Sequence, residues 1–242
     1  MISYDLLSRV GCRDNNEDNV GMFQAGEEYC FALADGLGGH GKGEVASGIA
    51  VEQAVAAFAQ AGEASEAVIH TAFQNGQEAI LEAQKADLSA RDMKTTFVYL
   101  LVGKEEIRWA HIGDSRLYRF EHGKLAERTL DHSVPQMLVA AGQIKEKQIR
   151  HHLDRNRLLR VMGTDWEEPR YQLGGPVPAT PGQAFLLCTD GFWEWIEEKK
   201  MISALKKSRT PREWLQRMEE IVLKQGRGEN MDNYSAIAVW TE

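Results

Sequence analysis

The chain has 242 residues, 43% of them hydrophobic and 26% charged, with a formal net charge of −8. The acidic surplus argues against general binding to nucleic acid or to an anionic membrane surface, because both need a surplus of Lys and Arg. We expect one cytoplasmic domain over residues 1–242, since there is no leader-like segment, membrane-length apolar run, repeat or linker, and three scattered cysteines suggest neither disulfides nor a zinc cluster.

The first part of the chain predicts a buried strand followed by helices. The run "YCFALA" at residues 29–34 is apolar and ends in Asp-Gly, which is typical of a strand that leaves a sheet through a turn. About 55 residues of helix are predicted next, with a break near Gly62. Apolar residues recur there at helical spacing in two runs, Val51, Val55 and Phe58, then Ile69, Phe73, Gly76 and Ile80.

The remainder predicts a strand meander, helices and further strands. Three β-branched and aromatic runs, "TTFVYLLVG", "EIRWAHIGD" and "SRLYRFEHG", are separated by short turns and should pair antiparallel. Residues 134–160 have a polar helical pattern interrupted at Gly142. Two later strand signals, "QAFLLCTDG" and "NYSAIAVW", flank a helix at about 211–224. This order predicts an α+β fold in which helices cover antiparallel sheet.

One basic segment, "KEKQIRHHLDRNRLLR" at residues 145–160, differs from the acidic whole. It has two interpretations. It is either a solvated helix face with long arginine stems, or a surface that meets an acidic or phosphorylated partner.

Aspartates stand where the apolar strands end. Asp35, Asp114 and Asp190 each follow such a strand, Asp232 precedes one, and "NNEDN" adds a further acidic cluster at residues 15–19. Any one of them could mark an ordinary turn. Together they predict a cation site, because convergent carboxylates repel unless a cation holds them.

Oxygen ligands favour a hard ion, so Mg²⁺ or Mn²⁺ is expected. Two such ions about 4 Å apart would acidify a bridging water into a hydroxide nucleophile, which suits phosphate ester hydrolysis. A cation for the phosphoryl oxygens and an acid for the leaving group are also needed. Arg13 and His40 lie beside the acidic motifs and can supply them.

These segments resemble the metal-dependent Ser/Thr protein phosphatases of type 2C, the PPM family. The resemblance follows the family's order over nearly the whole chain, through "GCRDNNEDN", "FALADGLGGHGKGEVAS", the Thr95-Thr96 pair, "AHIGDSRLYRF", "LDHSVPQML", "LLRVMG", "FLLCTDGFWEW" and "DNYSAIAV". It implies a four-layer α-β-β-α sandwich of two antiparallel sheets flanked by helices, with a metal centre in the cleft at one end. Residues 133–164 would form a flap beside that cleft. Lys94 departs from the pattern, because the family usually has Gly there.

The resemblance assigns metal ligands to matching positions. Asp35 would bridge two ions, with the Gly36 carbonyl on the second ion and Asp190 and Asp232 on the first. Asp18, with Glu17 beside it, would act on the second ion directly or through water. Asp114 would hold a third, weaker ion together with Asp190.

The resemblance also implies the reaction. Arg13 would grip the substrate phosphate, and His40 would protonate the departing serine or threonine oxygen. The expected activity is hydrolysis of phosphoserine and phosphothreonine in proteins by a metal-bridged hydroxide, by a monomer that reverses a bacterial Ser/Thr kinase. A phosphoprotein-binding module without turnover is the alternative.

Two rival interpretations fail. Residues 34–47 nearly match both a P-loop and a dinucleotide fingerprint, but Asp35 would repel bound phosphates and Gly43 stands where a P-loop needs Ser or Thr. "GDSRL" resembles an esterase block around Ser115, but a triad needs a downstream histidine, and the last histidine is His152.

Overall fold

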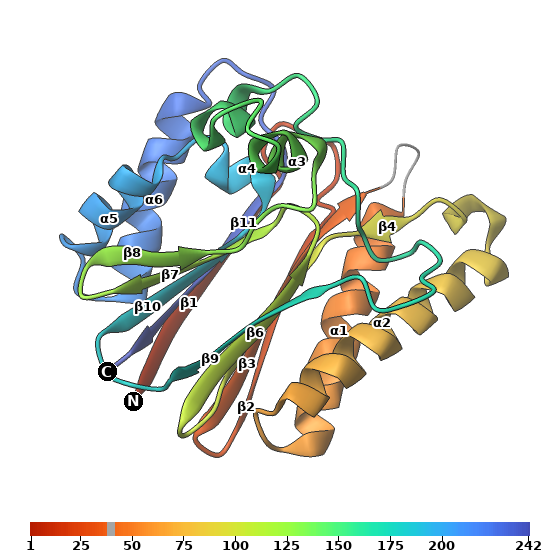
Figure 1. The fold of residues 1–242 in the computed structure, drawn as a ribbon, viewed down its shortest axis with the longest axis horizontal. Coiled ribbons are helices and arrows are strands. Elements are labelled where there is room, and N and C mark those ends of the chain that lie inside the picture. The colour runs from red at the N-terminus through yellow and green to blue at the C-terminus, as the bar shows by residue number, and fades with distance from the viewer. Residues whose placement is uncertain (38–41) are drawn as a thin grey trace.

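The computed structural model describes residues 1–37 and 42–242. Two antiparallel sheets face each other, and helices cover both outer faces (Figure 1). The first sheet has the order β1-β11-β10-β7-β8, with strands β1 (Ile2–Arg9), β11 (Tyr234–Thr241), β10 (Gln183–Cys188), β7 (Arg116–Glu121) and β8 (Lys124–Arg128). The second has the order β2-β3-β5-β6-β9, with strands β2 (Asp18–Ala25), β3 (Glu28–Leu37), β5 (Phe97–Val102), β6 (Glu106–Ile112) and β9 (Gln172–Pro178); β4 (Lys94–Thr95) pairs with the end of β3. The predicted four-layer α-β-β-α arrangement is confirmed.

The sheets are buried on both faces, which explains the continuous apolar runs in their central strands. All six residues of β5 are buried. Phe97, Tyr99 and Leu101 pack in a core beneath helices, whereas Val98 and Leu100 pack with residues of the opposite sheet. This alternation is the two-residue period of a strand.

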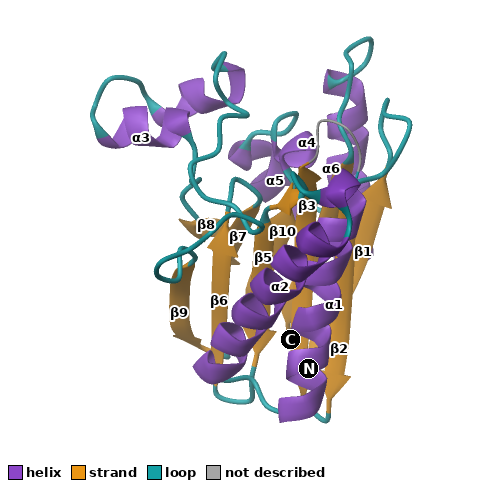
Figure 2. Cartoon of the chain, turned by 90° about the vertical axis from the view of Figure 1, so that its right-hand side faces the viewer, coloured by secondary structure: helices purple, strands orange, loops and turns teal. Residues whose placement is uncertain are grey.

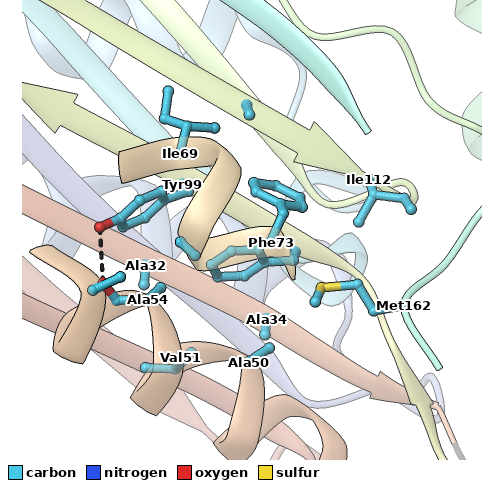
Figure 3. Close-up of a cluster of buried hydrophobic side chains, with 14 of the residues drawn as sticks. Ala32, Ala34, Ala50, Val51, Ala54, Ile69, Phe73, Tyr99, Ile112 and Met162 are labelled. Atoms are coloured by element: carbon cyan, nitrogen blue, oxygen red, sulfur yellow. Dashed lines mark hydrogen bonds between the residues drawn. The ribbon is translucent and has the colours of Figure 1, made fainter. Parts of the chain in front are cut away.

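Two long antiparallel helices, α1 (Gly43–Ala61) and α2 (Glu66–Ala86), cover the second sheet (Figure 2). The inner face of α1 carries alanines, which allow close approach to the sheet, and the Tyr99 hydroxyl donates a hydrogen bond to the Ala54 carbonyl at 2.9 Å (Figure 3). The break predicted near Gly62 is confirmed, because α1 ends there with Gly62 in the left-handed conformation, φ 70°. A short 3₁₀ turn, η1 (Leu88–Ala90), follows α2.

The other outer layer consists of α4 (Asp190–Trp193), α5 (Glu198–Leu205) and α6 (Pro211–Gln225). The helix predicted at 211–224 is therefore confirmed as α6. It begins at a Thr210 cap whose hydroxyl accepts the Glu213 N–H, and it buries Trp214 against the first sheet.

The flap region differs from the helical pattern predicted for residues 134–160. Only α3 (Val134–Ala140) and a 3₁₀ turn, η2 (Glu146–His151), are helical, and residues 152–160 form turns and extended chain. The left-handed Gly142, φ 70°, ends the first helix as expected. Beyond it most residues up to 160 are exposed, but Arg150 is buried.

Among the helices of the described residues, none combines the length and the apolar composition that a bilayer crossing requires.

Candidate metal centre

The strand-end aspartates converge at one end of the sandwich. A cavity of about 710 Å³ opens there, between the ends of the two sheets. Its lining includes Arg13, Asp35, Gly36, Asp114, Asp190 and Asp232, together with Asn156 and Leu158 of the flap. The sequence therefore predicted correctly that acids from separate strands meet, and that the flap borders the same space.

Asp18 stands directly across from Asp35 in the β2-β3 ladder. One of its carboxylate oxygens accepts the Thr189 hydroxyl at 2.9 Å, whereas Oδ1 is buried without a hydrogen-bond partner among the described residues. Burial, with repulsion from Asp190 added, raises the pKa of Asp18 to about 7, although the hydroxyls of Ser235 and Thr189 partly offset this. A buried carboxylate oxygen without a partner indicates that a cation belongs beside it.

Three more carboxyl groups share this destabilised environment. Burial is the main cause that raises the pKa of Asp35, Asp114 and Asp190. Repulsion adds to it, from Asp18 and Asp190 at Asp35 and from Asp190 at Asp114. In the protein without metal, these groups therefore resist being ionised together.

Asp232 is arranged differently from the other acids. The Arg13 guanidinium donates to both of its carboxylate oxygens, each at 2.9 Å, and this contact is the main cause that raises the pKa of Arg13. Within residues 1–37 and 42–242, no three His, Cys, Asp or Glu side chains already form a cage for a metal ion. The donor set still fits a hard divalent cation, because it is all oxygen, its carboxylates repel one another, and Asp18 Oδ1 has no hydrogen-bond partner in the described part of the chain.

Two threonines and a glycine fix the backbone at Asp35. The Thr96 hydroxyl accepts the Asp35 N–H at 3.0 Å, and the Thr95 hydroxyl donates to the Asp35 carbonyl at 2.8 Å. A Cβ on Gly36 would lie 2.2 Å from the Gly43 carbonyl oxygen and 2.7 Å from the Glu17 carbonyl oxygen. No side chain fits there, so this position in the chain requires glycine.

Lys94, the departure from the family pattern, causes no break in this arrangement. It pairs with Leu37 in the short β4 ladder, directly before Thr95.

Asp114 is held by residues that sequence reasoning did not assign. The Trp193 indole N–H donates to the Asp114 carbonyl at 3.0 Å, and the Gly113 N–H donates to His132 Nδ1 at 3.2 Å. The His132 ring stacks on His111 at 4.7 Å, and burial lowers the pKa of His132 to about 3. Both histidines thus support the turn that carries Asp114.

The basic segment 145–160 anchors the flap to the helix that begins at Asp190. Arg155 pairs with Glu194 at 2.9 Å. Arg150 donates to the Trp193 carbonyl and to Glu198, and its guanidinium lies 5.5 Å from the Trp193 ring centre. The interpretation as a solvated helix face is right about exposure for most of the segment but wrong about the helix, because most of the segment is not helical and Arg150 is buried.

One assigned residue cannot be placed. His40, expected to be the general acid, lies outside the described residues. The remaining assigned residues, Arg13, Asp18, Asp35, Gly36, Asp114, Asp190 and Asp232, all lie at this end of the sandwich.

The raised pKa of Asp18 predicts a pH effect on the metal-free protein. A carboxyl whose folded pKa is raised holds its proton more tightly in the folded state, so stability falls as pH rises from 3.8 to about 7. Replacing Asp18 by Asn should therefore raise the melting temperature in chelator at pH 8 and leave it almost unchanged at pH 4. Melting curves of both proteins in EDTA would test this. A wild-type advantage that grows with pH would contradict it.

Comparisons with known proteins place this arrangement in a family. The sequence model described as Protein phosphatase 2C matches residues 9–234. The serine/threonine phosphatase stp of Listeria monocytogenes serovar 1/2a is 30% identical over 204 residues, which span 82% of this chain and 80% of the relative.

Solved structures agree with the sequence match. The serine/threonine phosphatase PstP/Ppp of Mycobacterium tuberculosis superposes with a TM-score of 0.83 and 29% identity, covering 100% of this chain and 99% of that one. The catalytic domain of PstP in complex with two manganese ions superposes with a TM-score of 0.81 and 29% identity, covering 99% and 97%. With its two facing sheets, its convergent aspartates and these matches, the chain belongs to the protein phosphatase 2C (PPM) family.

Proposed function

We propose that this chain is a divalent-metal-dependent phosphatase that removes phosphate from phosphoserine and phosphothreonine in proteins. The observation that carries the proposal is the cavity where aspartates from both sheets meet, beside Asp18, whose Oδ1 has no hydrogen-bond partner within residues 1–37 and 42–242. The relatives named as serine/threonine phosphatases support the substrate class.

The cavity residues divide into two groups by their expected roles. Those that would hold two Mn²⁺ or Mg²⁺ ions are Asp35, the Gly36 carbonyl, Asp190, Asp232 and Asp18, with Asp114 and Asp190 for a third, weaker ion. Bound there, the ions would supply an acidified water and neutralise charge on the phosphoryl oxygens. The two manganese ions of the PstP catalytic domain support this assignment.

Arg13 is the side chain proposed to bind the substrate phosphate. Its guanidinium already forms a two-pronged contact with the carboxylate of Asp232. The same geometry suits two phosphoryl oxygens, which have similar spacing and charge. Arg13 would orient the phosphate so that water attacks phosphorus in line with the departing oxygen.

His40 is proposed to protonate that oxygen, on the strength of its place in the motif. Replacing His40 by Ala should reduce kcat strongly for an alkyl phosphate and weakly for p-nitrophenyl phosphate, because only a basic leaving oxygen needs an acid. Steady-state kinetics on the two substrates would test it. Equal losses on both would show that His40 has another role.

The partners follow from the reaction. A Ser/Thr kinase must supply the phosphoproteins, and we propose that the two act on shared substrates in the cytoplasm, with the phosphatase as a monomer.

Phosphate release from phosphothreonine and phosphoserine peptides, with a phosphotyrosine peptide of the same sequence as the control, tests the substrate class. Release from the first two alone is expected. Binding of phosphopeptides without release would favour the alternative, a phosphoprotein-binding module.

A further inference from the structure

One buried side chain, Asn233, holds the loop that carries Arg13. Residues 10–17 connect β1 to β2 and therefore cross from the first sheet to the second at the end where the aspartates gather. Asn233 directly precedes β11 and is only 6% exposed.

Every hydrogen-bonding atom of the Asn233 side chain is used on this loop. Its Oδ1 accepts the Glu17 N–H at 2.8 Å, and its Nδ2 donates to the carbonyls of Val10 and Asn15, each at 2.8 Å. A side-chain amide offers two N–H donors and one carbonyl acceptor. Asn233 thus holds the loop at its start, near its middle and at its end.

Asn233 also hydrogen-bonds to Asp232, the residue that Arg13 contacts. The Asn233 backbone N–H donates to Asp232 Oδ1 at 2.8 Å, and Arg13 bridges both oxygens of that carboxylate. The Arg13 side chain is about half exposed, with 44% of its surface accessible, so few contacts restrict it along its length. The position of its guanidinium therefore depends on how firmly the loop backbone is fixed.

We propose that Asn233 is a positioning residue for Arg13, and this rests on the proposed function of Arg13 as the phosphate-binding group. Without the amide, the Asn15 carbonyl and the Glu17 N–H lose their partner. The Val10 carbonyl keeps only the Arg13 backbone N–H, at 3.3 Å. The loop would then move toward water to satisfy them. Arg13 would spend less time where a phosphate can meet it.

The test compares two substitutions that remove a buried amide. Asn233→Leu keeps a similar volume without hydrogen bonds. Gln183→Leu is the control, because Gln183 is 3% exposed and its amide donates to the Pro178 carbonyl and the Thr180 hydroxyl. It begins β10, at the opposite end of the strand from Asp190.

The first readout is hydrogen exchange over residues 10–17, which requires neither metal nor turnover. Asn233→Leu should accelerate exchange in this loop, and Gln183→Leu should not. Unchanged exchange in Asn233→Leu would overturn the proposal. Because this readout is independent of catalysis, it stands even if phosphopeptides are not hydrolysed, so the two failures can be told apart.

The second readout is binding of inorganic phosphate to the Mn²⁺-loaded protein, measured by calorimetry. Asn233→Leu should weaken binding about tenfold, as expected from lost hydrogen bonds. The same substitution should add little when Arg13 is already Ala, because its effect passes through Arg13. Losses of equal size in both backgrounds would show that Asn233 does not act through Arg13.

Discussion

Replacing Asp35 by Asn is expected to abolish phosphatase activity and, at the same time, to stabilise the metal-free protein. Asp35 is proposed to bridge both ions. Replacing it should therefore reduce activity by more than the roughly 10–100-fold that is typical when a residue hydrogen-bonded to a metal ligand is replaced. Burial and repulsion from Asp18 and Asp190 raise the pKa of Asp35. A neutral side chain of the same shape relieves that repulsion.

Melting curves in EDTA would test the expected stabilisation, and phosphate release in Mn²⁺ would test the expected loss of activity. The melting temperature should rise by roughly 2–4 °C for each kcal/mol of repulsion relieved. Asp5→Asn is a suitable control, because Asp5 lies in β1 and faces Arg212 at 3.5 Å. An inactive Asp35→Asn protein that is also less stable would indicate a structural role for Asp35.

Replacing Arg13 by Ala is expected to reduce kcat/KM by roughly 10²–10³-fold, the range observed when one donor to a developing negative charge is removed. Arg13→Lys should recover only part of this, because an ammonium cannot make the two-pronged contact that the guanidinium makes with Asp232. Thermal stability should change little, since Arg13 and Asp232 are both partly exposed.

The control for Arg13 is Arg9→Ala. Arg9 lies four positions earlier, is similarly exposed and pairs with Glu219 at 3.0 Å, but it does not line the cavity. Steady-state kinetics on a phosphothreonine peptide should separate the two variants by at least tenfold. Equal kcat/KM values for Arg13→Ala and Arg9→Ala would show that Arg13 does not bind the substrate phosphate.

Much of the metal centre was predictable because the ends of buried strands can be recognised in the sequence. Central strands buried on both faces give apolar runs, and the residues just after them lie at the sheet edge. Asp114 and Asp190 carry this signal. Asp35 does not, because β3 continues through it to Leu37 and the turn expected at Asp35-Gly36 is absent. The edge strands β8 and β9 do not, because one is largely exposed and the other contains Gly and Pro.

The supporting contacts were not predictable, because they join segments far apart in the chain. The Trp193 indole contacts Asp114, 79 positions away, and Asn233 contacts Val10, 223 positions away. Tryptophan after a strand suggests only packing, and Asp-Asn suggests only a turn. For the same reason Arg150 and Arg155 predicted a solvated face, although Arg150 is buried against Glu198 of α5 and Arg155 pairs with Glu194 just after α4.

The convergent aspartates are proposed to form a divalent cation site on which phosphatase activity depends. The most direct test is a Mn²⁺ titration of chelator-treated protein, with bound metal followed by calorimetry and phosphate release from a phosphothreonine peptide followed in parallel. We expect no phosphate release in chelator, recovery of release that follows metal binding, and loss of both metal binding and release in Asp232→Asn. Full release in chelator, or undiminished metal binding and release in Asp232→Asn, would contradict it.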